Sequence, residues 1–420
     1  MTQDQDQEAQ RSEHRISAFR IALRSFSTQW FLIPQGTGII ATILHQLHYQ
    51  FNGLRIIADI FFVFTILTFI GFLLIYLLRI IILPRHVAHQ LASNIMETAC
   101  LASISIAFTT IIQMIALTLV SSWGTSWGMV AYVMWWINAV MAAFACIGIP
   151  YIMTKLEAPG VDSAPPSILL PVIAALTIAA GGGVVCRYGM LSAALQVPVI
   201  IVSYLFVGIG LPLSIVVDAI IFARIFDGSF PAKRMVYQLM LLCGPLGQGS
   251  FALQILGTCV QRGAFATYNT SSFISATGAS TIATSSQFLG LLTWGYGTFW
   301  WAFACIAVVH YVVTEPKTLL RWDKVLSSWS LVFPWGVYTN AAVQLGNVVL
   351  NSRAFWVWST ILTLLLVIIW LANLFAMVVG TFNGTLLELD RGWKAEYYES
   401  GAEHEKRESQ QSQQQNGSVN

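Results

Sequence analysis

Charged residues are scarce in this chain of 420 residues: Asp, Glu, Lys and Arg together make up 10% of it. Hydrophobic residues make up 56%, and the mean hydropathy is +0.69. A soluble protein of this length carries far more charge on its surface. The composition therefore indicates an integral membrane protein, with the lipid bilayer as its first partner. The net charge is only +2, so no nucleic-acid partner is expected.

Signals for metals, cofactors and catalysis are missing as well. The six cysteines show no CxxC spacing, and they lie in or beside apolar stretches, as buried thiols do. Two histidine pairs, at 45 and 48 and at 86 and 89, have no cysteine or carboxylate cluster around them. No nucleophile, base and orienting group converge on one apolar stretch. We expect no metal site, no cofactor and no enzymatic activity.

Long apolar stretches dominate what the chain does contain. Each has about 20 residues or more, the length that an α-helix needs to cross a bilayer. They predict ten transmembrane helices, at 26–47, 54–83, 98–120, 127–153, 167–186, 194–224, 235–261, 283–313, 328–350 and 354–382. One transmembrane domain, 26–382, thus separates a polar N-terminal tail at 1–25 from a C-terminal tail at 383–420. The first tail contains no apolar core of a signal peptide, and the second has the composition of a largely disordered segment.

Basic residues predict the orientation of these helices, because Lys and Arg favour the cytoplasmic side of short loops. All but four of the 21 Lys and Arg lie in the tails or near loops that follow even-numbered helices. The exceptions are Arg55, Arg187, Arg262 and Arg353. Both termini are therefore expected in the cytoplasm. This orientation places one glycosylation sequon, at Asn269, on the opposite side, so Asn269 is the candidate glycosylation site.

The odd-numbered and even-numbered stretches differ in composition. Odd stretches are rich in Gly, Pro, Ser, Thr, Asn and Gln, whereas even stretches are almost purely apolar. This alternation predicts five helical hairpins, with the odd helices around a central pore and the even helices against lipid. Close helix packing through small residues is the alternative interpretation. Because no charged residue lies near the middle of an odd stretch, the path suits a small anion or a neutral solute.

Three short segments contain the candidate pore and gate residues. The seventh stretch contains GPLGQGSF at 244–251, which predicts irregular backbone inside the membrane. In the ninth stretch, Pro334 can turn the preceding Phe333 inward as a plug, or the two can form a packed kink without a gate. The full set is Gly36, Thr37, Gly38, Gly244, Pro245, Gly247, Gln248, Gly249, Phe333, Pro334 and Asn340.

One acidic residue is unusual. Asp218 lies inside the sixth stretch, six residues before Arg224. A carboxylate at that depth can pair locally with Arg224, or it can relay protons and couple them to transport. The ion pair is the favoured interpretation, and coupling is the alternative.

These motifs resemble those of the tellurite-resistance/dicarboxylate transporter family, which includes the slow anion channels. Within that family the similarity is greatest to the fungal sulfite efflux pumps. It depends on GTGI at 36–39, HQL at 45–47, WW at 135–136, FPWG at 333–336 and above all GPLGQGSF at 244–251. One difference is that 94–110 reads NIMETACLASISIAFTT, without proline or glycine.

The resemblance implies ten helices arranged as five hairpins around a pore, in a protein that is commonly trimeric. It implies that Phe333 corresponds to the aromatic gate of the anion channels. It also implies a plasma-membrane protein that exports sulfite. A permease for malate or another small dicarboxylate is the closest alternative, and a non-conducting membrane sensor that kept the fold is another.

Overall fold

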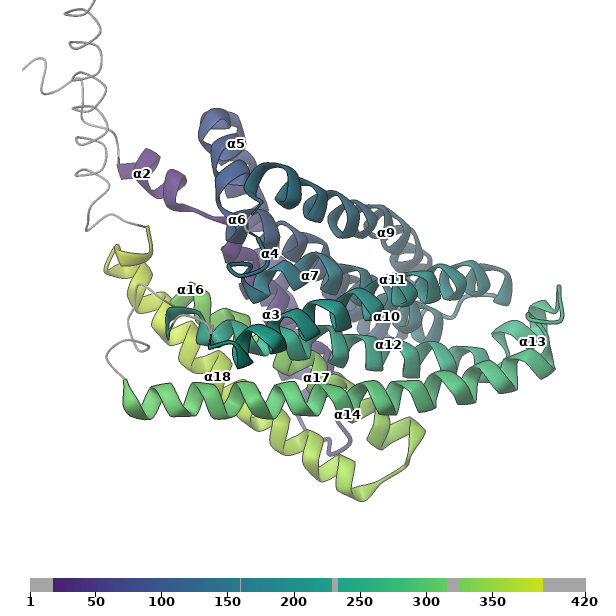
Figure 1. Cartoon of the computed structure of the whole chain (residues 1–420). Coiled ribbons are helices and arrows are strands. Elements are labelled where there is room, and N and C mark those ends of the chain that lie inside the picture. The colour runs from purple at the N-terminus through teal and green to yellow at the C-terminus, as the bar shows by residue number, and fades with distance from the viewer. Residues whose placement is uncertain (1–17, 159, 229–232, 316–324, 388–420) are drawn as a thin grey trace, which may run out of the picture.

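The computed structural model describes residues 18–158, 160–228, 233–315 and 325–387, and these are folded into helices joined by short turns (Figure 1). Eight helical segments of this part are long and apolar enough to cross a membrane. They are Leu54–Ile82 (α4), Ile95–Trp123 (α6 to α8), Ser126–Glu157 (α9 and the turn after it), Pro166–Tyr188 (η4 and α10), Ala193–Phe226 (α11), Val236–Gln261 (the end of η5, and α12), Ala276–Thr314 (α14) and Arg353–Phe382 (α18).

Two further helices are buried but less apolar. These are α3, Leu32–Gln46, and α17, Val332–Gln344, which correspond to the first and ninth predicted transmembrane helices. Every residue of α17 is buried, and so are residues 32–44 of α3. Their polar side chains lower the hydropathy of both helices. Neither helix can face lipid, and both depend on being enclosed by the other helices.

Five buried helices contact one another in a closed cycle. In order around this ring they are α3, α7 (Ala102–Met114), α10 (Leu170–Tyr188), α12 (Cys243–Gln261) and α17, which returns to α3. Each of the helices α4, α9 (Ser126–Ile152), α11, α14 and α18 packs from outside against two consecutive ring helices. Figure 1 shows α14 and α18 crossing one side of the molecule, over the ring.

Burial separates the two sets of helices. In the segments that contain α7, α10 and α12, the most apolar stretch of 18 residues is 83%, 94% and 100% buried. In the segments that contain α4, α9, α11, α14 and α18, that stretch is only 22% to 39% buried. The outer helices expose rows of Leu, Ile, Val and Phe, as lipid-facing surfaces do. The compositional alternation along the sequence therefore corresponds to an inner and an outer layer.

Four ring helices begin in the same way. A 3-10 helix leads into the α-helix, and a proline occupies the first α-helical turn. The prolines are Pro34, Pro171, Pro245 and Pro334. First-turn N–H groups have no partner within their own helix, so a proline there removes no hydrogen bond.

The prediction of irregular backbone at 244–251 is therefore wrong. Helix α12 continues without a break from Cys243 to Gln261, and the non-α geometry lies before it, in the 3-10 helix Lys233–Leu242 (η5). The glycines in the motif do not interrupt the helix, because neighbouring helices hold them in place. Pro334 likewise stands at the start of α17 and does not break its middle.

The ring helix without a proline, α7, is held at its start by an ion pair. The short helix Ile95–Cys100 (α6) precedes it, and the buried carboxylate of Glu97 accepts a hydrogen bond from Arg79 of α4. Glu97 also accepts from the backbone N–H of Thr28 at 3.2 Å, and the Thr28 hydroxyl donates to the Glu97 carbonyl at 2.6 Å. These bonds tie the starts of α3 and α7 to the end of α4.

Glycines set the spacing between ring helices. A Cβ atom at Gly38 would lie 2.0 Å from the Thr110 hydroxyl of α7, and one at Gly336 would lie 2.5 Å from the Ile39 side chain of α3. At Gly247 a Cβ atom would lie 2.6 Å from the backbone nitrogen of Tyr338 in α17. Since backbone cannot rotate out of the way as a side chain can, α12 and α17 can approach this closely only with glycine at 247.

We expect Gly247→Ala to destabilise the protein by about 1–3 kcal/mol, the usual cost of overpacking. The measurement is the thermal unfolding temperature of the purified protein in detergent, which should fall by several degrees. Gly208→Ala is the matched control: Gly208 is an exposed glycine of α11 whose Cβ position meets nothing within 4 Å. Alanine there should leave stability unchanged or raise it slightly. Equal unfolding temperatures for the two variants would contradict this account of the α12–α17 contact.

Candidate functional site

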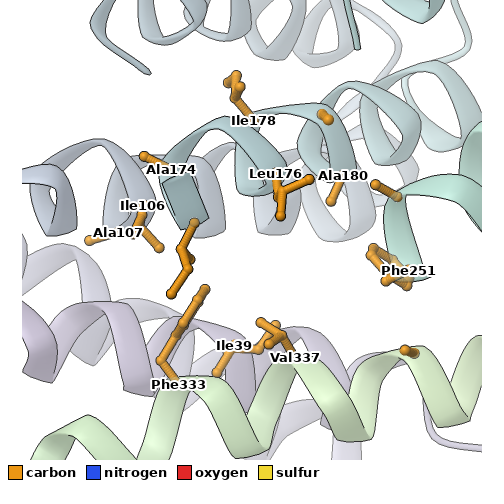
Figure 2. Packing of buried hydrophobic residues seen from close by; sticks show 14 of the residues in the cluster. Ile39, Ile106, Ala107, Ala174, Leu176, Ile178, Ala180, Phe251, Phe333 and Val337 are labelled. Atoms are coloured by element: carbon orange, nitrogen blue, oxygen red, sulfur yellow. The ribbon is translucent and has the colours of Figure 1, made fainter. Parts of the chain in front are cut away.

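One face of α17 contains a row of four side chains at positions 333, 337, 340 and 344, spaced as successive turns of an α-helix. Phe333 and Val337 are buried, at 1% and 0% exposure. Figure 2 shows both projecting from α17 toward the helices opposite, beside Ile39 of α3. By its spacing, Asn340 lies on the same face as Phe333. This row places an aromatic ring and two amides in line along one ring helix.

Several buried amides of the ring have polar atoms that no described residue satisfies. Both polar atoms of Gln35 and of Asn340 have no hydrogen-bond partner. One polar atom is also unpartnered in each of Gln113, Gln248 and Gln344. An unsatisfied buried polar group costs about 1–3 kcal/mol. Four of the five ring helices, α3, α7, α12 and α17, thus present hydrogen-bonding capacity that the described residues do not use.

Most hydroxyl groups of the ring are, in contrast, already occupied; the exception is the buried hydroxyl of Ser103 in α7, which has no partner among the described residues. The Thr37 hydroxyl donates to the Ile33 carbonyl at 2.8 Å and accepts from the Trp370 indole of α18 at 3.0 Å. The hydroxyls of Thr109 and Thr339 donate to carbonyls one turn earlier in their own helices. Amides are therefore the main hydrogen-bond donors and acceptors that the ring has available. A donor with no partner can bind an anion, which accepts hydrogen bonds but offers none.

The predicted site segments come together at the ring. Gly36 faces Val332 and Trp329 near the start of α17, and Gly38 faces α7. A Cβ atom at Gly244 would lie 3.5 Å from the side chain of Pro334, so the segments GPLGQGSF and FPWG lie against each other. The last glycine of the first motif, Gly249, faces Leu211 of the outer helix α11. Packing accounts for these glycines, and their lining of a path stays a prediction.

The amino-terminal ends of the ring helices lie at one end of the ring. The segments that lead into them, η1 (Thr28–Phe31), α6, η4 (Pro166–Leu169), η5 and η7 (Trp329–Leu331), contact one another in the same order as the helices. Contacts of η7 with α3 complete the cycle. A helix N-terminus carries a partial positive charge of about half an elementary charge. Five of them at one end make that end attractive to anions.

Asp218 lies outside the ring, buried on α11. Its carboxylate accepts no close hydrogen bond from the described residues, and its polar neighbours are Tyr296 of α14 and Cys243 of α12. Arg224 instead donates to the Ala164 carbonyl at 2.5 Å. The favoured sequence interpretation, an ion pair between Asp218 and Arg224, is therefore wrong, because the two side chains turn to different neighbours.

Asn269 follows the short helix Ala264–Tyr268 (α13) and is exposed. Its backbone has a positive φ of 36°, which asparagine tolerates better than most residues. The side chain is thus accessible in a turn, as a modified asparagine must be.

Sequence reasoning missed two features of this site. Gln35, Gln113 and Gln344 were not among the predicted site residues, although all three lie in odd-numbered stretches rich in small and polar residues. Amide content on the buried face was the available signal. The pairing of Glu97 with Arg79 had no such signal, because the two lie in different helices.

A ring of uncharged polar helices enclosed by lipid-facing ones defines an integral membrane protein that is organised around its own axis, as transporters and channels are. The chain belongs to the voltage-dependent anion channel family, whose family model matches residues 25–378. The resemblance read from the motifs is thereby confirmed, and the protein is a membrane transporter of this family.

Individual relatives cover most of the chain. A sulfite efflux pump of Arthroderma otae is 29% identical over 86% of this chain and 91% of its own length. A sulfite efflux pump of Trichophyton rubrum matches with the same identity and coverage. A malic acid transport protein of Schizosaccharomyces pombe is 22% identical over 85% of this chain and 78% of its own length.

Proposed function

We propose that the protein exports sulfite through the centre of the ring, with Phe333 as the gate. Ten membrane-spanning helices in five hairpins would then surround one pathway. The observation that carries this proposal is the row on α17, where Phe333 stands in line with the unpartnered amide of Asn340. Amides hold an anion without binding it tightly, so the ion can leave as fast as it enters.

Direction of transport follows from the ends of the ring helices. With the cytoplasmic termini that the basic residues favour, the positive N-terminal ends face the cytoplasm and attract the anion there. An interior-negative membrane potential then drives a monovalent anion outward, by about 2.3 kcal/mol per 100 mV. We place the protein in the plasma membrane, without a cofactor and without enzymatic activity. Assembly as a homotrimer is part of the same proposal.

Sulfite is the proposed substrate because the sulfite efflux pumps of Arthroderma otae and Trichophyton rubrum are 29% identical to this chain, whereas the malic acid transport protein is 22% identical. Export of malate or another small dicarboxylate is the second candidate. A larger dianion requires a wider opening at Phe333, which makes the difference measurable. The third candidate is a sensor that kept the fold and does not conduct.

We expect Phe333→Ala to raise sulfite flux several-fold, because the substitution removes the ring that closes the pathway. Flux is measured from proteoliposomes at a fixed imposed potential, with malate, chloride and nitrate as competing ions. Phe265→Ala is the matched control: Phe265 is equally buried, at 1% exposure, but lies in α13, outside the ring. A flux increase in both variants would point to general loosening and not to a gate.

The same assay separates the three candidates. Preference for sulfite over malate supports the efflux proposal, and the reverse preference assigns the protein to dicarboxylate transport. If neither the wild type nor Phe333→Ala shows flux, although both proteins are folded, the non-conducting sensor is the remaining candidate.

Since the ion pair with Arg224 does not form, proton coupling is the remaining functional interpretation of Asp218. We expect sulfite flux to respond to an imposed pH gradient in the wild type and to lose that response in Asp218→Asn. Asp59→Asn is the control, because Asp59 is an exposed carboxylate near one end of α4. If flux in Asp218→Asn follows the pH gradient as in the wild type, Asp218 has no part in coupling.

The orientation has its own test. We expect N-glycosylation at Asn269 when the full chain is expressed in a eukaryotic host, because the proposed topology places this exposed turn outside the cytoplasm. The measurement is a mobility shift on treatment with a glycosidase, absent in Asn269→Gln. Modification at the Asn383 sequon instead would contradict the proposed orientation.

A further inference from the structure

A cavity of about 310 Å³ opens at the carboxyl-terminal ends of α10 and α12, opposite the five N-termini. The ends of two ring helices and the starts of α11 and α13 form its walls. Its polar lining comes from Arg187, Arg262, Gln196 and Thr267, with the thiols of Cys186 and Cys259. The volume is enough for about ten water molecules at roughly 30 Å³ each, so a small ion fits with part of its hydration shell.

Two arginines share this cavity without a carboxylate to neutralise them. Neither Arg187 nor Arg262 forms an ion pair with any described residue. The buried Nε of Arg187 has no hydrogen-bond partner. Acidic residues are absent from the loops around it: no Asp or Glu occurs at 187–194 or at 262–283. Among the described residues no carboxylate neutralises these charges, so both guanidinium groups are available to an anion.

The rest of the cavity wall is held in place by hydrogen bonds that leave the arginines free. The Cys259 thiol donates to the Gly183 carbonyl at 3.3 Å, which fixes α12 against α10. The Gln196 amide nitrogen donates to the Leu191 carbonyl at 2.6 Å, so its position is set. The Arg187 guanidinium lies 5.3 Å from the centre of the Tyr188 ring, a contact that orients its planar group and leaves its donors available.

We propose that Arg187 and Arg262 bind a small oxyanion in this cavity, as a site separate from the ring. Guanidinium groups present paired donors that match two oxygens of one anion, which a lysine cannot do. Helix C-termini carry partial negative charge, and arginines beside them also offset that charge without any ligand. That simpler arrangement does not account for a cavity that both arginines line. The binding itself does not depend on transport. A role for this cavity as the last site that the exported anion meets, at the end of the ring opposite the five N-termini, rests on the proposed function.

The test is equilibrium binding of sulfite to the purified full-length protein in detergent at low ionic strength, followed by calorimetry. We expect Arg262→Gln and Arg187→Gln each to weaken binding about tenfold, the effect of losing one charge-assisted hydrogen bond. Arg262 is exposed, so its substitution should not disturb folding. Arg262→Lys should recover only part of the affinity, because an ammonium cannot bind two oxygens.

Arg55→Gln and Arg353→Gln are the matched controls, since both residues are exposed arginines that do not line the cavity. Both should bind sulfite like the wild type. If sulfite also binds inside the ring, that second site adds its own component to the binding isotherm. The substitutions in the cavity should leave this component unchanged. Wild-type binding in the double variant Arg187→Gln with Arg262→Gln would overturn the proposal.

Flux measured on the same preparations keeps the two proposals apart. Loss of binding in Arg262→Gln, with no sulfite flux in any variant, would support the cavity site and reject sulfite export. Sulfite flux together with unchanged binding in both arginine variants would support sulfite export and reject the cavity site.

Discussion

Hydrocarbon cannot satisfy a polar group, and this constraint determines where each helix of the protein can lie. Helices α3 and α17 carry too many amides and hydroxyls to meet lipid, so they are stable only inside a wall of other helices. The five outer helices supply that wall, each packing against two consecutive ring helices. A polar interior is thus possible only when all the helices of the chain are packed together, and a single helix hairpin cannot form one.

Contact between ring helices in turn depends on the absence of side chains at a few positions. At Gly247 the backbones of α12 and α17 approach too closely for a Cβ atom, and the position of α17 sets the position of Phe333. The prolines at the starts of four ring helices act on a different property, the geometry of the first turn. In α7 the ion pair of Glu97 with Arg79 holds the helix start without a proline. Two kinds of local chemistry therefore produce the same arrangement of helix ends.

Composition was sufficient to predict the helical membrane class and the division into buried and lipid-facing helices, because the demand of lipid for apolar side chains acts on every residue of a span. It could not predict the backbone of GPLGQGSF. Glycine and proline lower helix propensity in isolation, and the neighbours that stabilise a helix at 243–261 are distant in sequence. The same reason accounts for Asp218, whose surroundings depend on how α11 meets α14. Spacing along one helix can be read from a sequence, whereas contact between helices cannot.

Hydrogen bonds from the last part of the chain to the first ring helix have a consequence for synthesis of the protein. The Asn347 amide donates to the Gln46 carbonyl at 2.9 Å, and the Trp370 indole donates to the Thr37 hydroxyl at 3.0 Å. Both donors leave the ribosome long after α3 has reached the membrane. Until then α3 has only its early neighbours, such as α4 and α7, to shield its polar side chains. The polar side chains of α3 are therefore fully enclosed only when the last helices of the chain have been added.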